Sequence, residues 1–166
     1  MPAKTGKQYI ERVDNAKANV WIDGKRITGK ISEHPAFRGV MKSQAELYDL
    51  QHHPDKVDFM TYRSPTTGDR VGTSFIQPRT KEDLEKRRMM MQEWARHHNG
   101  MMGRAPDYIN TAIMAYGSAA DMFGAQDPMY AENMRKYYKY CRENDLSLTH
   151  TLILPQVNRG VNAAKL

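Results

Sequence analysis

The chain has 166 residues, of which 40% are hydrophobic and 27% charged, and its mean hydropathy is −0.76; this composition is typical of a folded globular domain and excludes disordered, fibrous and membrane-spanning chains. Lys and Arg outnumber Asp and Glu by 25 to 19, and the net charge of +6 is not concentrated in one tract, which argues against nucleic acid as a partner. The single cysteine, Cys141, excludes an internal disulfide framework, and the first residues lack the apolar stretch of a signal peptide, so we expect a cytoplasmic protein.

The first half of the chain predicts short helices separated by turns. Apolar residues at helical spacing predict a short amphipathic helix over residues 5–17. Asp23-Gly24 follows, and this pair between two short apolar runs predicts a β-hairpin, because glycine tolerates the positive φ of the turn. A second helical pattern runs from about residue 36 and stops before Pro54. Proline and glycine interrupt residues 59–78, which we interpret as a loop with β-prone pieces for a second hairpin.

Three longer helices dominate the second half. Thr80 is a typical N-cap for a helix that ends near His98, and the mixed charges of this helix, Arg87 among them, indicate a solvated face. The next helix is predicted over residues 106–124, and the last begins after the N-cap Asp127. Since each apolar stripe is unstable in water until it is covered, we expect these helices to form one antiparallel layer. The stripe predicted for the last helix consists of Tyr130, Met134, Tyr137 and Cys141.

The last segment changes to a period of two. Leucines and one histidine, His150, alternate with threonine and isoleucine, which predicts a strand entering a sheet. A lone strand cannot satisfy its backbone hydrogen-bonding groups, and the chain ends twelve residues after Leu154. We therefore expect an N-terminal helical domain over residues 1–145, followed at residues 146–166 by the start of an incomplete β domain in a truncated chain.

The common catalytic and metal-binding motifs are absent. The sequence has no glycine-rich dinucleotide motif, no Walker loop, no His-Glu-x-x-His and no Cys-x-x-Cys. His52-His53 and His97-His98 are adjacent pairs whose side chains diverge by about 100° on a helix, so we expect no metal site.

Two polar groups of residues are candidates for a functional site. Arg104 and Tyr108 lie four residues apart around the start of a helix, where the structural alternative is an arginine paired with a surface carboxylate and a packed tyrosine. His150 shares a strand face with leucines and precedes hydrogen-bond donors at residues 156–159; here the structural alternative is a core histidine ahead of a polar loop. The residues by themselves leave both alternatives open.

At these same residues the sequence resembles a known family, the oxygenase component of 4-hydroxyphenylacetate 3-monooxygenase, and the likeness follows the whole chain in order. The segments that carry it are His34-Pro-Ala-Phe-Arg38 with Leu47-Tyr-Asp49, Met102-Gly-Arg104 with Pro106-Asp-Tyr108, and His150 with Pro155-Gln-Val-Asn-Arg159. The resemblance implies a mainly α fold, the N-terminal helical domain of an acyl-CoA-dehydrogenase-like flavoprotein, with two short hairpins and the first strand of a following β domain.

The resemblance also implies a reaction and its partners. A separate flavin reductase would supply FAD already reduced, and O2 would provide the oxygen atom that enters a phenol ortho to its hydroxyl group. Family members generally use FAD, although the sequence does not decide between FAD and FMN, and the full-length protein is expected to be a homo-oligomer. The fragment by itself is expected to be inactive. Carried over by motif, Arg104, Tyr108 and His150 would contact the substrate hydroxyl and the flavin, and His150, Gln156, Val157, Asn158 and Arg159 would line the flavin.

The physical chemistry of a phenol agrees with these roles. Its pKa is about 10, so forming the phenolate at pH 7 costs about 4 kcal/mol. A cation within hydrogen-bonding reach lowers such a pKa by about 1 to 3 units, and a neutral histidine accepts the proton. Arginine itself stays protonated, so we assign electrostatic stabilisation to Arg104 and proton acceptance to His150.

Two other interpretations are kept. A 4-hydroxybutyryl-CoA dehydratase-type flavoprotein belongs to the same superfamily, but it needs cysteine ligands for an iron–sulfur cluster, and residues 94–102 contain no cysteine. The other interpretation is a non-catalytic helical interaction fragment or a gene remnant, which the sequence of residues 1–166 does not exclude.

Overall fold

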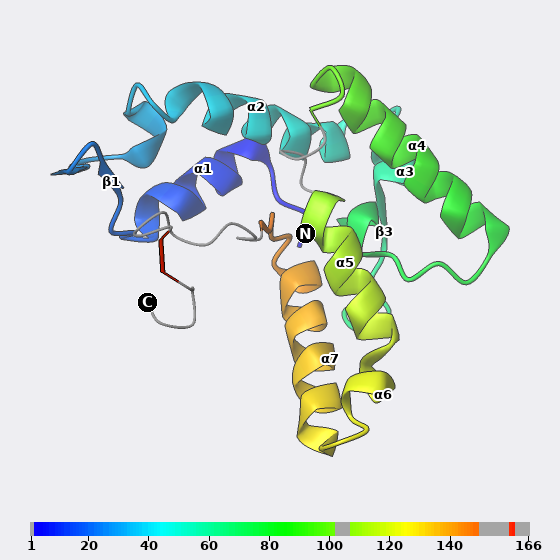
Figure 1. Ribbon diagram of the computed structural model, residues 1–166. Helices are drawn as coiled ribbons and strands as arrows, with labels where there is room; N and C mark the ends of the chain where they lie inside the picture. The colour runs from blue at the N-terminus through cyan, green and yellow to red at the C-terminus, as the bar shows by residue number, and fades with distance from the viewer. Residues whose placement is uncertain (1, 102–106, 150–159, 162–166) are drawn as a thin grey trace.

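The computed structural model describes residues 2–101, 107–149 and 160–161, and the side chains of residues 107 and 108 also lie outside the description. Helices dominate this part of the chain (Figure 1). The α-helices are α1 (Gly6–Asn15), α2 (Arg38–Asp49), α3 (Val57–Met60), α4 (Lys81–His97), α5 (Asp107–Ser118), α6 (Ala120–Phe123) and α7 (Pro128–Glu143). The strands are β1 (Trp21–Ile22), β2 (Lys25–Arg26), β3 (Thr61–Arg63) and β4 (Arg70–Gly72), and the 3-10 helices are η1 (Ile31–Glu33), η2 (Leu50–His52) and η3 (Thr73–Phe75).

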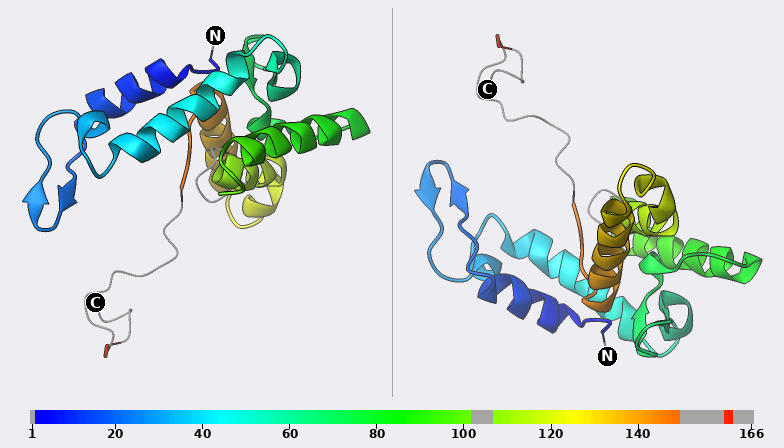
Figure 2. Two further views of the ribbon diagram at one scale, coloured as in Figure 1. Left: turned by 90° about the horizontal axis from the view of Figure 1, so that it is seen from above. Right: turned by 90° about the horizontal axis from the view of Figure 1, so that it is seen from below.

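Helices α1 and α2 lie side by side (Figure 2). A capping box starts α1: the Thr5 hydroxyl accepts from the Gln8 amide, and the Gln8 side chain accepts from the Thr5 amide. Gly6 allows the two backbones to approach, because a Cβ at this position would lie 2.5 Å from the carbonyl oxygen of Ala45. The helices expected over residues 5–17 and from residue 36 are confirmed.

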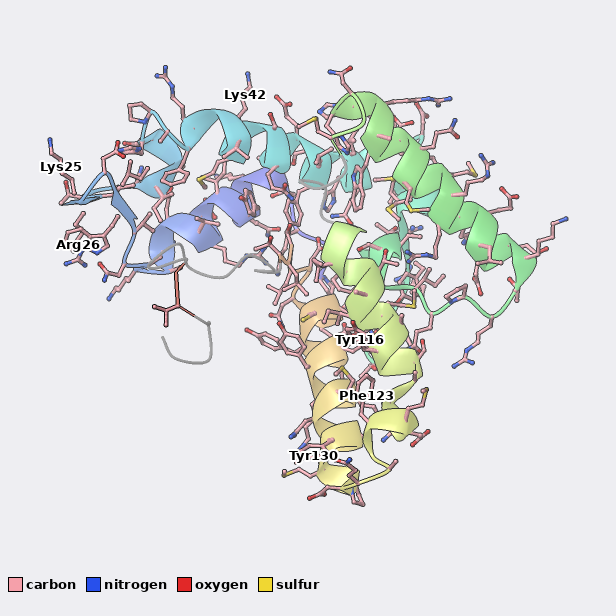
Figure 3. The ribbon with its side chains drawn as sticks, viewed as in Figure 1. Lys25, Arg26, Lys42, Tyr116, Phe123 and Tyr130 are labelled. Atoms are coloured by element: carbon pink, nitrogen blue, oxygen red, sulfur yellow. The ribbon has the colours of Figure 1, made fainter. Side chains whose placement is uncertain are left out.

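Both hairpins are present. In the first, Asp23 and Gly24 have φ angles of 48° and 73°, the two positive values that a tight two-residue hairpin turn requires. Figure 3 shows Lys25 and Arg26 on this hairpin, at the edge of the molecule. In the second hairpin β3 pairs with β4 in antiparallel register, Thr61 opposite Gly72. The hairpin expected at Asp23-Gly24 and the one allowed for within residues 59–78 are therefore confirmed.

The single helix expected over residues 106–124 is wrong, because the described part of this segment forms two helices. α5 ends at Ser118, Ala119 has non-helical dihedrals (φ −101°, ψ 23°), and α6 then begins. The Ser118 hydroxyl donates to the carbonyl oxygen of Met114 at 3.0 Å, one turn earlier. Such a bond competes with the backbone ladder and bends a helix, which accounts for the break.

Within the described residues the core forms two hydrophobic clusters, so the expectation of one antiparallel layer of three helices is also wrong. The α2–α4 cluster comprises Leu47, Met60, Met90 and Trp94. The α5–α7 cluster comprises Phe75, Met114, Tyr138 and Cys141. Helix α4 therefore packs against α2 and α3, while α5 and α7 form an antiparallel pair on η3 (Figures 1 and 2).

The buried face of α7 differs from the stripe predicted for it. Tyr130 and Tyr137 are 49% and 46% exposed, whereas Tyr138 and Cys141 are buried. Figure 3 shows Tyr130 on the outer surface at the start of the helix. Only part of the predicted stripe therefore faces the core.

Two glycines explain this rotation of α7. A Cβ at Gly117 in α5 would lie 2.7 Å from the Tyr138 ring, and one at Gly124 would lie 2.8 Å from the Cβ of Ala131. The absent side chains leave room for α7 to approach along the face of Ala131 and Tyr138. The polarity pattern of α7 alone carries no information about these partners.

Candidate functional site

Most of the site residues predicted from the sequence lie outside the described residues. These are Arg104, His150, Gln156, Val157, Asn158 and Arg159. Tyr108 is the second residue of α5, and its side chain is outside the description. The predicted strand is described only at residues 146–149, which form neither helix nor strand. Within the structure, the site is therefore represented by the residues that flank these segments.

The flanking residues meet at one face of α2. Ser147, three residues before His150, accepts a hydrogen bond from the Gln44 amide at 3.2 Å. Gln44 also lines a cavity of about 250 Å³ together with Met101, which is three residues before Arg104. One predicted segment therefore begins next to Gln44, and the other begins at the cavity that Gln44 lines.

The cavity is mostly apolar with a few polar groups. Its lining residues are Val40, Ser43, Gln44, Leu47, His98 and Met101. Both ring nitrogens of His98 are buried without a hydrogen-bond partner. A volume of about 250 Å³ lies just below the ~300 to 1,000 Å³ typical of ligand pockets. Apolar walls with an imidazole, an amide and a hydroxyl suit a small aromatic molecule that carries polar substituents.

A buried polar network fixes the point at which the chain leaves α7. The Asp145 carboxylate accepts from the backbone amide of Lys4 at 2.8 Å and from the Gln51 side chain at 2.9 Å. The backbone carbonyl oxygen of Asp145 accepts from the Tyr48 hydroxyl at 3.0 Å and from the Arg12 guanidinium at 3.3 Å. Asp145 therefore joins the N-terminal segment, α1, α2 and η2 to the segment that precedes His150.

The electrostatics of this network follow from its burial. Asp145 is 4% exposed, and burial raises the pKa of its carboxyl more than the hydrogen bonds from Lys4 and Gln51 lower it. Burial also raises the pKa of Tyr48, so its hydroxyl remains a neutral donor. Asp145 has a φ of 47°, a left-handed conformation that costs about 1 to 2 kcal/mol for a residue with a side chain. The network holds Asp145 in this strained conformation.

A second network holds the first turns of α5, where Tyr108 lies. The Arg87 guanidinium donates to the Ser74 carbonyl at 2.8 Å and to the Thr111 hydroxyl at 2.7 Å. Asn110 donates to the Ser74 hydroxyl at 3.2 Å, and its own side-chain oxygen is buried without a partner. Arg87 is only 6% exposed, so its assignment to a solvated face of α4 is wrong. It is buried because η3 presents carbonyl groups to it.

Gln44, Arg87 and Asp145 were not identified from the sequence as residues that hold the segments flanking the predicted site. Asn144-Asp145 after a helix is a recognisable end signal, since both residue types tolerate positive φ. Gln44 and Arg87 give no such local signal, because their partners lie 103 and 24 residues away in the sequence.

Two further observations concern metals and membranes. Among the described residues, no group of three or more His, Cys, Asp or Glu side chains is placed to hold a metal ion. None of the described helices is both long and apolar enough to cross a lipid bilayer.

The arrangement of helices defines the class of protein. The fold is that of the N-terminal helical domain of acyl-CoA-dehydrogenase-like proteins, as the family resemblance implied. An archaeal 4-hydroxybutyryl-CoA dehydratase from N. maritimus shares it with a TM-score of 0.70 at 19% identity, over 87% of this chain and 28% of that chain. At this identity the likeness supports the fold alone.

The family is defined more narrowly by the sequence. The chain belongs to the 4-hydroxyphenylacetate 3-hydroxylase N-terminal family, which it matches over residues 5–165. It is 56% identical over 160 residues to the 4-hydroxyphenylacetate 3-monooxygenase oxygenase component of Geobacillus sp. (strain PA-9), covering 96% of this chain and 32% of the relative. The family resemblance inferred from the motifs is therefore confirmed.

A solved structure agrees with this assignment. The oxygenase component of 4-hydroxyphenylacetate 3-monooxygenase, in complex with FAD and 4-hydroxyphenylacetate, superposes with a TM-score of 0.85 at 44% identity. The alignment covers 98% of this chain and 33% of that one. The chain therefore spans about a third of the length of the relatives that it matches.

Proposed function

We propose that this chain forms the N-terminal part of the oxygenase component of a two-component flavin-dependent monooxygenase that hydroxylates a phenol ortho to its hydroxyl group. The observation that carries the proposal is the match along residues 5–165, with 56% identity to the Geobacillus oxygenase. The substrate class is a 4-hydroxyphenylacetate-type phenol, the cofactor is reduced FAD from a separate reductase, and O2 is the oxidant. A dehydratase function has less support, because that relative is 19% identical.

The reach of the chain supports the convergence of Arg104 and His150. His150 lies three residues beyond Ser147, which contacts Gln44, and Arg104 lies three residues beyond Met101, which lines the same cavity as Gln44; three residues span at most about 10 Å. Both side chains can therefore reach a common substrate near the cavity between α2 and the end of α4.

Each residue has a role that follows from its chemistry. Arg104 stabilises the developing phenolate by its permanent charge, and His150 accepts the phenol proton while neutral. Tyr108, the second residue of α5, would donate or accept a hydrogen bond at the same hydroxyl group. Bound FAD supplies the activation of O2. The donors at residues 156–159, two amides and a guanidinium among them, suit the ring oxygens and phosphates of a flavin, and we assign His150 to the same flavin site.

The same proposal includes the organisation of the longer protein. Residues 1–145 form the helical domain, and residues 146–166 begin the β domain. The end of α7 at Glu143 and the absence of helix at residues 146–149 agree with this boundary. The full-length oxygenase is expected to be cytoplasmic and to form a homo-oligomer. Size-exclusion chromatography with light scattering tests the oligomeric state.

The decisive experiment uses the full-length oxygenase with a flavin reductase, NADH, FAD and 4-hydroxyphenylacetate. We expect a catechol product, measured by chromatography against oxygen consumed. Arg104→Ala and His150→Ala should each lower the product yield by at least about 100-fold. The matched control is Arg88→Ala, which removes an exposed arginine that pairs with Glu85 in α4.

The outcomes separate the proposals. Product from the wild type and from Arg88→Ala, with loss in both site variants, supports the function and the roles. Near-normal product in both site variants contradicts the assigned roles but leaves the function. No product from folded, FAD-binding wild-type protein with any phenol contradicts the function and favours a non-catalytic fragment.

A further inference from the structure

The end of α7 is a helix terminus in which an aspartate takes the place usual for glycine. Leu146 donates from its amide to the Cys141 carbonyl at 3.1 Å, and Asp145 donates to the Arg142 carbonyl at 3.2 Å. These two bonds form the Schellman motif, whose left-handed residue is most often glycine. Here that residue is Asp145, with a φ of 47°. A left-handed aspartate at this point suggests that its side chain has a function that glycine cannot supply.

The contacts of Asp145 show what the side chain does. One carboxylate oxygen, Oδ2, accepts both from the Lys4 amide (2.8 Å) and from the Gln51 side chain (2.9 Å). The backbone carbonyl of the same residue is held by Arg12 and Tyr48. The side chain and the main chain of Asp145 are therefore fixed from two directions, by elements that lie 94 to 141 residues away in the sequence.

The neighbouring strand leaves space for this arrangement. A Cβ at Gly72 would lie 2.7 Å from the Gln51 side-chain oxygen and 3.3 Å from Oδ1 of Asp145. Gly72, at the end of β4, thus admits both side chains. The arrangement is a built pocket for one carboxylate, and the segment beyond it is tied again where Gln44 donates to Ser147.

We propose that Asp145 is a positioning residue of the oxygenase, which fixes the direction in which the chain leaves α7 and so places His150. The proposal deepens the proposed function and rests on it. His150 is five residues further on, and a changed dihedral at Asp145 would displace it by several ångströms over such a span. A misplacement of about 1 Å in a catalytic group can lower a rate by about 100-fold.

Three variants separate the side chain from the backbone conformation. Asp145→Asn keeps an oxygen acceptor for Lys4 and Gln51 and tolerates positive φ. Asp145→Ala removes the acceptor and keeps the strain, whereas Asp145→Gly removes the acceptor and relieves the strain. If the side chain positions His150, Ala and Gly should behave alike, and Asn should behave like the wild type.

The matched control lies at the other end of the same helix. Asp127 caps α7 by accepting from the Met129 amide at 2.8 Å, far in sequence from the exit segment. Asp127→Ala therefore weakens α7 without changing residue 145. A purely structural role for Asp145 would give the same functional result as this control.

Two readouts are needed. The first is amide hydrogen exchange at Lys4 and Leu146, which should rise at least tenfold in Asp145→Ala and Asp145→Gly and stay within twofold in Asp145→Asn and Asp127→Ala. The second is the ratio of hydroxylated product to hydrogen peroxide in the full-length oxygenase. We expect that ratio to fall at least tenfold in the Ala and Gly variants, with KM for the phenol changing less.

The results decide the proposal in every case. The proposal is overturned if Asp145→Ala and Asp127→Ala give the same product ratio. It is also overturned if Asp145→Asn lowers that ratio as much as Asp145→Ala does. Where Asp145→Ala does not fold, Gln51→Leu takes its place, because it removes one donor to the carboxylate and leaves residue 145 intact. A wild type without hydroxylation contradicts the proposed function, and amide exchange then still shows whether Asp145 holds the exit.

Discussion

The two hydrophobic clusters of the molecule are built by different means. The α2–α4 cluster is a contact of large apolar side chains, in which Trp94 is 1% exposed and its indole N–H donates to the Leu47 carbonyl at 3.1 Å. The α5–α7 cluster is smaller in side-chain volume and is bordered by buried polar groups. In it the Tyr138 hydroxyl donates to the Phe75 carbonyl at 2.6 Å, and Arg142, 4% exposed, lies over the Tyr138 ring.

The difference shows which part of this fold is held by apolar packing and which part is held by directional hydrogen bonds. Apolar packing is not directional, so the packing in the α2–α4 cluster holds α4 in place without fixing the orientation of individual groups. Hydrogen bonds are directional, and they concentrate at η3, at the start of α5 and at the end of α7. The start of α5 follows the predicted site segment at residues 102–106, and the end of α7 precedes the segment that contains His150. The hydrogen bonds at these two places therefore lie next to both segments of the predicted site.

The largest loss of stability is expected for a substitution in the α2–α4 cluster. Trp94→Ala should lower the free energy of unfolding by about 3 to 5 kcal/mol, because it leaves a cavity and an unpaired Leu47 carbonyl. Urea unfolding followed by circular dichroism measures this. Leu84→Ala, on the same helix but 58% exposed, should change stability by about 0.5 kcal/mol or less. Equal losses in both variants would contradict the existence of a packed α2–α4 core.

A smaller effect is expected when a single hydroxyl group is removed from the α5–α7 cluster. Tyr138→Phe removes the hydroxyl that donates to the Phe75 carbonyl and should cost about 1 to 3 kcal/mol. The control is Tyr140→Phe, two residues later on α7, where the ring is 57% exposed and the change should be close to zero. If Tyr138→Phe is as neutral as its control, the α5–α7 cluster is held by packing in the same way as the α2–α4 cluster.

Helix α4 offers a third test, at its first turn. Thr80→Ala removes the cap that accepts from the Asp83 amide at 3.2 Å and should cost about 1 kcal/mol, whereas Thr80→Ser should retain most of the stability. The same urea titration applies. Loss in both variants would show that the threonine methyl group, and not its hydroxyl, stabilises the helix start.

The smallest effects are changes in pH dependence, and here two neighbouring acids should act in opposite directions. Burial opposes ionisation of Glu143, but hydrogen bonds from Ser64, Arg142 and Thr67 hold the pKa of its carboxyl below the usual value. Its contribution to stability is therefore present above about pH 4.3 and is lost as the pH falls further. Glu143→Gln should flatten the acid side of the stability curve.

Asp145 has the opposite sign. Burial raises the pKa of its carboxyl above the usual value of about 3.9, so the folded state holds this proton more tightly than the unfolded state. Stability should therefore fall as the pH rises above about 4, through the raised pKa. Asp145→Asn should remove this fall, and unfolding curves measured from pH 3 to pH 7 show it. Identical curves for Glu143→Gln and Asp145→Asn would contradict the assignment of opposite shifts.

Local chemistry in the sequence predicted the features that depend on neighbouring residues. Thr80 and Asp127 were identified as caps, and Asp23-Gly24 as a hairpin turn, because each acts on a backbone within a few residues of itself. The break after Ser118 and the buried face of α7 depend instead on contacts between helices. Gly117 illustrates this: its importance comes from the Tyr138 ring opposite it, which sequence periodicity does not reveal.

The candidate site shows the same division. The motifs around Arg104, Tyr108 and His150 indicated a family, and the match over residues 5–165 confirms that family. The roles of those side chains stay predictions. The contacts of Gln44 and Asp145 next to the predicted site are not predictable from the sequence, because Gln44 contacts Ser147 across 103 residues and Asp145 contacts Lys4 across 141.

The hairpin of β1 and β2 offers a practical use. Its turn at Asp23 and Gly24 has positive φ angles, and a Cβ at Gly24 would find no heavy atom within 4 Å. The hairpin also projects from the edge of the molecule (Figure 3). A short affinity tag or fluorophore-binding peptide inserted there would be accessible for purification and labelling while leaving both hydrophobic clusters undisturbed.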